Sequence, residues 1–508
     1  MIYYCKLIKT MPMTPKNISR RTFIKNSAIA TSSLSLLPMI SIEQLDPTLP
    51  LMTRDFGKLN HQVTTFGLGG QASIQWTPAD VDPVAIIVKA FNLGVNYFDT
   101  SNLYGPSQLN FGKAFNKLGL IPGKAGYNEK LRKSIFLTSK TGLRYAKGDL
   151  QVPGLFNYSN GDDGSHAIDD VKRSLTQIFG DGKGYYPKGA YLDMVLAHTI
   201  AQQPDVDAIM EGYDNPDPKA ERIGALAALL DYRDGTNTTG LNPKEEKLIK
   251  HIGFSGHHDT ALMMQLIRRD HKNILDGMLV SINANDKLNF NMQHNVIPVA
   301  KASNMGVIGM KTFADGAMYT KEATWSNNPK HVVRSVGSSE VPYAPLIQYS
   351  LTTPGIDTLI IGIGQISDNI AHCQLANNIA ASQITRDGLS AAQRLQIEEW
   401  AAKVKNGQTN YFQIKEGGLS AVHNIKLEKA KSNLLNLSWD TAYAGEHPID
   451  KYLVYKNDEL IGNIAHQPQI SDKPFSFHVK VKADEQNNIQ IVSLDKGGKK
   501  VASDVLKA

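Results

Sequence analysis

The chain has 508 residues, of which 42% are hydrophobic and 20% are charged, so wholesale disorder and a polytopic membrane protein are both excluded. This length exceeds one ordinary core and favours two domains, or one barrel with an appendage. The formal net charge is +6, but six basic residues precede the first acidic residue, Glu43, and the near-neutral remainder lacks the basic face that nucleic-acid binding requires.

Residues 1–45 have the pattern of a targeting signal. Paired arginines, Arg20 and Arg21, are followed by Phe23 and Lys25 and then by an apolar run that is too short and too rich in Ser and Thr to span a bilayer. The segment resembles a twin-arginine export signal. That resemblance implies the twin-arginine export machinery as a partner and a location in the periplasm or cell envelope; a disordered basic tail is the alternative.

Residues 52–405 alternate short β-branched or aromatic runs with amphipathic stretches, as repeated βα units do. Helical stretches such as Pro83–Asn92, Ala167–Ile178 and Met292–Ser303 separate the strands. The eight predicted strands are Thr64–Leu68, Asn96–Asp99, Ile135–Lys140, Tyr191–His198, His251–Ser255, Gly277–Asn283, Gly306–Lys311 and Thr358–Ile363. This pattern predicts an α/β fold with a closed (β/α)₈ TIM barrel; a doubly wound open sheet is the alternative.

Three irregular segments interrupt the barrel pattern, at residues 123–133, 202–242 and 319–343. Long loops that follow strands shape substrate pockets on such barrels. We therefore expect the second and third segments to cover the same end of the barrel.

Residues 415–508 have short alternating strands separated by turns rich in Asn, Asp and Gly, which predicts a small all-β sandwich domain. The strands are predicted at Leu434–Trp439, Lys451–Lys456, Phe475–Val481 and Asn488–Leu494. The L-x-W and Y-L-V-Y motifs in the first two strands resemble a fibronectin type III domain. The sequence departs from that pattern at Gln490 and Ile491, where a corner tyrosine is expected.

Polar side chains close six of the predicted barrel strands, and the carboxyl ends of barrel strands are where active sites lie. One or two such residues would be ordinary caps or turn formers, but six that converge favour an active site. They are Asp99, Lys140, His198, Ser255, Asn283 and Lys311.

Four residues carry a sharper signal. Asp99 begins the run D-T-S-N-L-Y that ends at Tyr104, Lys140 closes F-L-T-S-K, and His198 closes L-D-M-V-L-A-H. This constellation resembles the aldo/keto reductase superfamily over nearly the whole barrel. The resemblance implies an oxidoreductase that interconverts a small-molecule carbonyl compound and an alcohol by hydride transfer, with NADP or NAD as its cofactor.

The chemistry explains why these residue types are needed. Hydride delivery to a carbonyl carbon makes an alkoxide, so a proton donor must lie within hydrogen-bond reach of that oxygen. Tyr104 is the candidate acid, and the ammonium of Lys140 is expected to lower its pKa. Asp99 would orient the lysine, and a neutral His198 would hydrogen-bond the carbonyl oxygen.

The resemblance also implies a set of cofactor-binding residues. Ser255 matches a serine that holds the nicotinamide carboxamide, but Gly256 replaces the asparagine that usually follows. Asn283 stands where a glutamine usually lies under the nicotinamide, and Lys311 is expected to contact a cofactor phosphate or a substrate carboxylate.

The adenosine end of the cofactor is expected near the last barrel strand. Gly362 and Gly364 would let backbone N–H groups approach the phosphates, and Asn378 is the best match for an adenine-contacting asparagine. The arginine that commonly grips the 2′-phosphate in this loop is missing, so NADP and NAD both remain open.

Two other functions were weighed. A non-catalytic envelope protein could use a reductase-like barrel to bind a glycan or another protein, although an intact Tyr104 and Lys140 argue against it. A metal-dependent barrel hydrolase is the other alternative. Adjacent His257 and His258 on a strand point to opposite sides, and we expect no metal.

Overall fold

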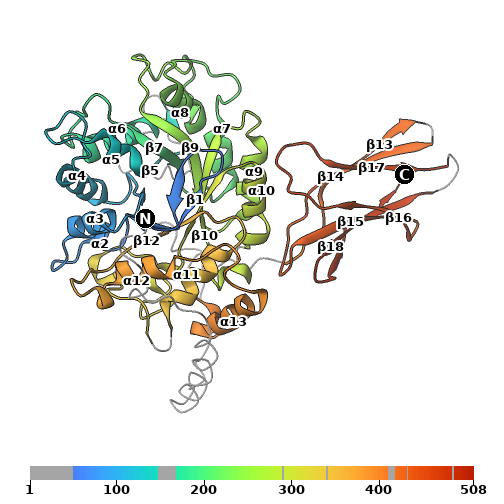
Figure 1. Ribbon diagram of the computed structural model, residues 1–508. Helices are drawn as coiled ribbons and strands as arrows, with labels where there is room; N and C mark the ends of the chain where they lie inside the picture. The colour runs from blue at the N-terminus through green and yellow to red at the C-terminus, as the bar shows by residue number, and fades with distance from the viewer. Residues whose placement is uncertain are drawn as a thin grey trace, which may run out of the picture.

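The computed structural model describes residues 50–146, 167–288, 291–338, 341–409, 418–431, 433–482 and 486–507. They form a barrel ringed by helices and a β-rich C-terminal body beside it (Figure 1). The predicted targeting signal, residues 1–45, lies outside the described residues, so its assignment stays a prediction. None of the helices in these ranges is long and apolar enough to cross a membrane.

Eight strands close the barrel in chain order, and each pairs in parallel with its neighbours. They are β3 (Phe66–Gly69), β4 (Tyr97–Asp99), β5 (Phe136–Thr141), β7 (Leu192–Ala197), β9 (Ile249–Gly256), β10 (Leu275–Ser281), β11 (Gly306–Met310) and β12 (Thr358–Ile361). The last strand pairs with the first through Leu359 and Phe66. The predicted TIM barrel is therefore confirmed, and the open doubly wound sheet is wrong.

The helices between the strands turn their apolar faces inward. The longer ones are α3 (Pro83–Asn92), α4 (Ser107–Lys117), α6 (Ala167–Phe179), α7 (Gln203–Met210), α8 (Ala225–Asp234), α9 (Thr260–Arg269), α10 (Val296–Ala302), α11 (Tyr343–Thr352), α12 (Gln374–Ala381) and α13 (Ala391–Ala401). Helix α3 begins where predicted, because Pro83 follows Asp82, whose carboxylate accepts the N–H of Val84 at 2.8 Å.

The predicted helix Met292–Ser303 is interrupted. A 3₁₀ turn covers Met292–His294, and α10 starts only at Val296. Between them Asn295 has φ −119° and ψ −89°, which is not helical. Its side chain is hydrogen-bonded to the backbone of Ala444 in the C-terminal body.

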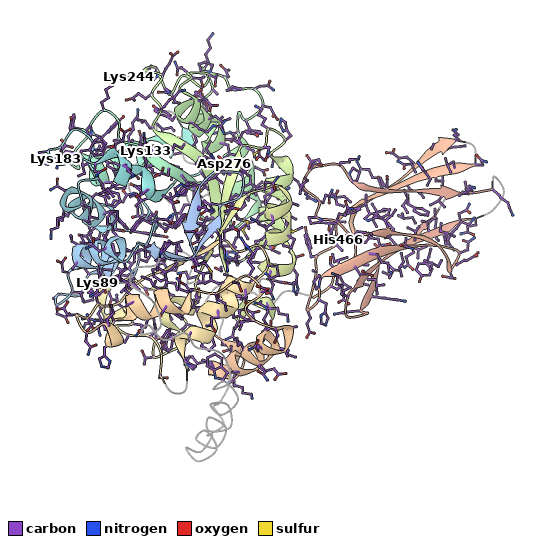
Figure 2. All side chains as sticks on the ribbon, viewed as in Figure 1. Lys89, Lys133, Lys183, Lys244, Asp276 and His466 are labelled. Carbon is purple, nitrogen blue, oxygen red and sulfur yellow. The ribbon has the colours of Figure 1, made fainter. Side chains whose placement is uncertain are left out.

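A hairpin that was not predicted closes the amino end of the barrel. Its strands are β1 (Thr53–Asp55) and β2 (Gln62–Thr64), and Phe56 between them packs its ring 5.2 Å from that of Phe136. Lys58 of the same turn pairs with Asp276, near the start of β10, at 3.4 Å; Asp276 is labelled in Figure 2. Since side chains fill this end, chemistry is confined to the opposite mouth, at the carboxyl ends of the strands.

The C-terminal body is an antiparallel β-sandwich, as predicted. One sheet holds β13 (His423–Lys431), β14 (Leu434–Asp440) and β17 (Phe475–Lys480); the other holds β16 (Glu459–Ala465), β15 (Ile449–Lys456), β18 (Asn488–Asp495), β19 (Lys500–Ala502) and β20 (Leu506–Lys507). Trp439 of the first sheet and Tyr452 of the second are fully buried, with ring centroids 5.8 Å apart. The sandwich lies beside α9 and α10 (Figure 1).

Candidate active site

The four residues of the predicted constellation meet at the carboxyl mouth of the barrel. Asp99 ends β4, Lys140 is the last but one residue of β5, and His198 directly follows β7. These strands are neighbours in the parallel barrel, so their ends bring the three side chains together. Tyr104 enters from the loop after β4.

A buried ion pair forms the floor of the site. Lys140 Nζ lies 2.6 Å from Asp99 Oδ1 and donates a second hydrogen bond, at 3.0 Å, to the carbonyl oxygen of Thr100. Each side chain is only 1% exposed. Within the described residues the other carboxylate oxygen of Asp99 has no hydrogen-bond partner, so the pair depends on this one contact.

Tyr104 and His198 lie over the ion pair. The ammonium of Lys140 is 4.6 Å from the centroid of the Tyr104 ring, and the Tyr104 and His198 rings are 5.8 Å apart in an edge-on arrangement. Ser101 Oγ lies 3.4 Å from His198 Nδ1. A phenol, an ammonium, a carboxylate and an imidazole from separate parts of the chain therefore share one buried site.

Burial sets the protonation of the two rings. It lowers the pKa of His198 well below its usual value, and the charges of Lys140 and Lys311 lower it further, so the imidazole is neutral as expected. Burial also raises the pKa of Tyr104 well above its usual value, with the carboxylates of Asp99 and Asp315 adding to the effect. The net shift of the Tyr104 pKa is therefore upward, opposite in direction to the lowering expected from Lys140.

A cavity of about 110 Å³ lies beside Tyr104. Asp99, Tyr104, Lys311, Asp315 and Gly362 are among its lining residues, and it is roofed by the irregular segment 312–338. The predicted role of the segment 319–343 in covering the mouth therefore fits the part of it that the structure describes.

Lys311 and Asp315 form a second charged group in this cavity. Lys311 Nζ lies 3.9 Å from Asp315 Oδ1 and 5.0 Å from the centroid of the Trp325 ring. Lys321 approaches the other oxygen of Asp315 at 2.9 Å. Burial alone would raise the pKa of Asp315, but the charges of Lys311 and Lys321, with hydrogen bonds from Lys321 and Ser326, lower it, so the carboxylate stays charged.

Ser255 and Gly256 lie against the loop that carries His198. Ser255 is fully buried, and its Oγ accepts the N–H of Thr199 at 2.9 Å. A Cβ atom at Gly256 would lie 2.1 Å from Met263 Sδ. A side chain at position 256 would therefore require Met263 to move.

Asn283 is used as a brace. Its Nδ2 donates to Asp286 Oδ2 at 2.8 Å and to the carbonyl oxygen of Lys311 at 3.1 Å, and its Oδ1 accepts the N–H of Asn285 at 2.9 Å. These bonds join the end of β10 to the end of β11. A contact between Asn283 and a nicotinamide ring stays a prediction.

Gly362, Gly364 and Asn378 lie together at the end of β12 and on α12. A Cβ atom at Gly364 would lie 2.1 Å from the carbonyl oxygen of Val333, so the glycine lets the segment over the cavity approach closely. Asn378 is fully buried, and within the described ranges neither polar atom of its amide has a hydrogen-bond partner. A contact between Asn378 and an adenine base stays a prediction.

Asp315, Trp325 and Asp286 belong to the site but were not singled out from the sequence. Trp325 places its ring 6.4 Å from that of His257 and lies in the irregular segment. The only signal for these residues was their position soon after β10 and β11, since their roles depend on loop conformations that no periodicity encodes.

Asp286 gives a pH-dependent prediction. Burial raises the pKa of its carboxyl to about 8, while an unfolded chain releases this proton near pH 4. The folded state therefore binds the extra proton between these values, and stability falls as the pH rises through that window. Asp286→Asn mimics the protonated acid, and urea unfolding should find it more stable than the wild type at pH 8 by on the order of a few kcal/mol.

The same comparison at pH 4 provides the control for Asp286→Asn. At this pH the folded wild type is protonated and the unfolded chain is about half protonated, so the advantage of the variant should nearly vanish. An equal difference at both pH values would contradict a neutral buried Asp286.

Comparisons with known proteins were made for the whole chain. The model described as "Aldo/keto reductase family" matches residues 65–383. A putative voltage-gated potassium channel subunit beta from Schizosaccharomyces pombe is 30% identical over 166 residues, which is 29% of this chain and 48% of that protein. The chain thus spans about half the length of this curated relative.

Solved structures give further matches. An aldo-keto reductase from Bacillus halodurans in its holo form is 18% identical, with a TM-score of 0.41 over 69% of this chain and 96% of that chain. An aldo/keto reductase from Klebsiella pneumoniae in complex with NADP and acetate is 17% identical, with a TM-score of 0.42 over 69% of this chain and 95% of that chain.

Proposed function

The chain belongs to the aldo/keto reductase family, and on that premise we propose that it interconverts a carbonyl compound and an alcohol by hydride transfer, with NADP or NAD as cofactor. The observation that carries the proposal is the buried set of Tyr104, Lys140, Asp99 and His198 beside a cavity at the barrel mouth. A non-catalytic binding protein would have no need of a buried, nearly isolated lysine–aspartate pair beneath a phenol.

The protonation of the site favours reduction. When bound, the reduced nicotinamide supplies the hydride, and Tyr104 gives its phenolic proton to the carbonyl oxygen. The raised pKa keeps that proton on Tyr104 until the alkoxide forms. Lys140 then stabilises the resulting phenolate, since its ammonium faces the ring, and the neutral His198 orients the carbonyl oxygen.

The residues present fit a dinucleotide. Lys311 at the cavity would contact a phosphate, Gly362 lines the same cavity, and the orphaned amide of Asn378 would contact the base. Ser255 would lie near the nicotinamide end. The Klebsiella pneumoniae reductase described above is in complex with NADP, and we take NADP(H) as the first cofactor to test here.

The segment over the cavity supports tight retention of the cofactor, because it packs directly on Gly364 through Val333. Purified protein should release NADP(H) or NAD(H) when it is denatured, and mass spectrometry of the supernatant identifies which. If no nucleotide is released, and if neither NADPH nor NADH then binds to the native protein in a fluorescence titration, the proposed function is wrong.

We further propose that the chain is exported through the twin-arginine pathway to the periplasm or cell envelope. The support is the pair Arg20 and Arg21 with Phe23 and Lys25 after them. Replacing both arginines by lysine should leave the protein in the cytoplasmic fraction, and unchanged export would contradict the proposal.

The two-sheet C-terminal domain, with Trp439 at its centre, supports a fibronectin type III-like architecture.

A further inference from the structure

The β-sandwich is joined to the barrel through two buried asparagines that lie just before α10. Asn295 pairs with both backbone groups of Ala444: its Oδ1 accepts the N–H at 2.8 Å, and its Nδ2 donates to the carbonyl oxygen at 3.2 Å. Asn291 Nδ2 donates to the same carbonyl oxygen at 2.8 Å and also to that of Gly445. Asn291 and Asn295 are 2% and 4% exposed, so these bonds are shielded from water.

The turn Ala444–Gly445, here named the sandwich turn, is itself firmly placed. Ala444 is buried, and a Cβ atom at Gly445 would lie 2.5 Å from the backbone nitrogen of Leu419. Arg268 of α9 adds a second contact to the sandwich, at 3.8 Å from Asp440 and 3.2 Å from Gln469. The sandwich therefore presents a rigid backbone edge to the barrel at the place where the helix Met292–Ser303 is interrupted.

A continuous chain of hydrogen bonds leads from this joint to the mouth of the barrel. The N–H of Asn291 donates to the carbonyl oxygen of Asp286 at 3.2 Å. The carboxyl group of Asp286 is bonded to Asn283, which in turn holds the carbonyl oxygen of Lys311. Lys311 lines the same cavity as Tyr104.

The backbone along this path is strained and needs support. Asn291 has φ +46° and Lys311 has φ +64°, a conformation that L-residues adopt only when their surroundings impose it. Asn283 donates a hydrogen bond to the carbonyl oxygen of Lys311, and Asn291 donates hydrogen bonds to the sandwich turn. The Asn291 side chain is held by the two carbonyl oxygens of the sandwich turn, and its backbone is bonded to Asp286 and Asn295.

We propose that the sandwich turn positions the active-site mouth, with Asn291 and Asn295 as positioning residues that transmit its placement through Asp286 and Asn283 to Lys311. The C-terminal domain is thus part of the reaction site's support and not a separate binding module. The effect on catalysis rests on the proposed function, whereas the mechanical coupling does not.

The test uses full-length Asn291→Gly and Asn295→Ala. Glycine keeps the positive φ of position 291 and removes only the side chain. The matched control is Asn457→Gly, which removes another asparagine at positive φ, in the exposed β15–β16 turn, where its Oδ1 accepts the N–H of Asn488. Hydrogen exchange is measured on the nucleotide-free protein, and steady-state kinetics are measured with a carbonyl substrate.

Both joint variants should lose exchange protection in residues 283–287 and 306–312, while the control does not. In active protein, kcat should fall by roughly tenfold to a hundredfold, with a melting temperature close to that of the control variant. Unchanged protection in these two segments would overturn the proposal. If protection is lost and the wild type proves inactive, the coupling stands and the proposed function fails, so the two claims are tested separately.

Discussion

Tyr104→Phe is expected to lower kcat for carbonyl reduction by about 10²–10⁴-fold while leaving nucleotide binding nearly unchanged. In the proposed reaction the phenol of Tyr104 gives its proton to the carbonyl oxygen, and the raised pKa keeps that proton in place at neutral pH. Phenylalanine preserves the ring that packs between Lys140 and His198. Stopped-flow or steady-state absorbance of the reduced cofactor measures the loss.

The matched control for Tyr104→Phe is Tyr97→Phe. Tyr97 is also fully buried on β4, but its hydroxyl bonds Thr138 at 2.9 Å, away from the mouth. Losing this hydroxyl should lower the free energy of unfolding by on the order of one hydrogen bond. The kcat of Tyr97→Phe should stay within a few-fold of that of the wild type. Equal losses of kcat in the two variants would mean that Tyr104 acts through folding and not as the acid.

Lys140→Met is expected to abolish turnover and to destabilise the protein by about 3–5 kcal/mol, because it leaves the Asp99 carboxylate buried without its partner. The 2.6 Å contact is the single ion pair that the described part of the chain gives Asp99, and both side chains are almost fully buried. Urea unfolding at neutral pH measures the loss. Burial already raises the pKa of Asp99, so the deficit should shrink at acid pH, where this carboxyl is protonated in both states.

The double variant Lys140→Met, Asp99→Asn separates stability from catalysis. Neither position then carries a charge, so most of the lost stability should return. Activity should not return, since no ammonium remains to stabilise the phenolate of Tyr104. A double variant that regains turnover would exclude Lys140 from the reaction.

Much of the barrel could be predicted because its strands are buried runs closed by polar residues. Asp99, Lys140 and His198 each end such a run, and parallel strands necessarily bring their ends to one mouth. Helix α3 was predicted to the residue because Asp82 and Pro83 encode its start chemically. In these places local sequence and tertiary structure agree.

Other features could not be predicted because they depend on contacts between distant segments. Strands β13 and β16 were not predicted: most of their residues are exposed, and the alternation in β13 is confined to a short stretch around Ile425 and Leu427. The hairpin β1–β2 is fixed by Phe56 inside the barrel. The direction of the Tyr104 pKa shift depends on burial that only the fold creates.

Helix α10 shows how the second domain changes the first. The sequence Met292–Ser303 has a helical pattern throughout, yet Asn295 leaves the helical conformation to bind the backbone of Ala444. The hydrogen bond that Asn295 makes in this conformation is to a residue 149 positions away in the chain. No pattern within the barrel contains that information.

The most direct test of the proposed reaction follows the hydride itself. The protein is incubated with NADPH, and separately NADH, carrying deuterium at C4 of the nicotinamide, together with a panel of aldehydes, ketones and sugars, and the alcohol products are analysed by mass spectrometry. We predict one deuterium on the former carbonyl carbon with the wild type and almost none with Tyr104→Phe. Binding of the cofactor without deuterium transfer to any carbonyl in the panel would contradict the account.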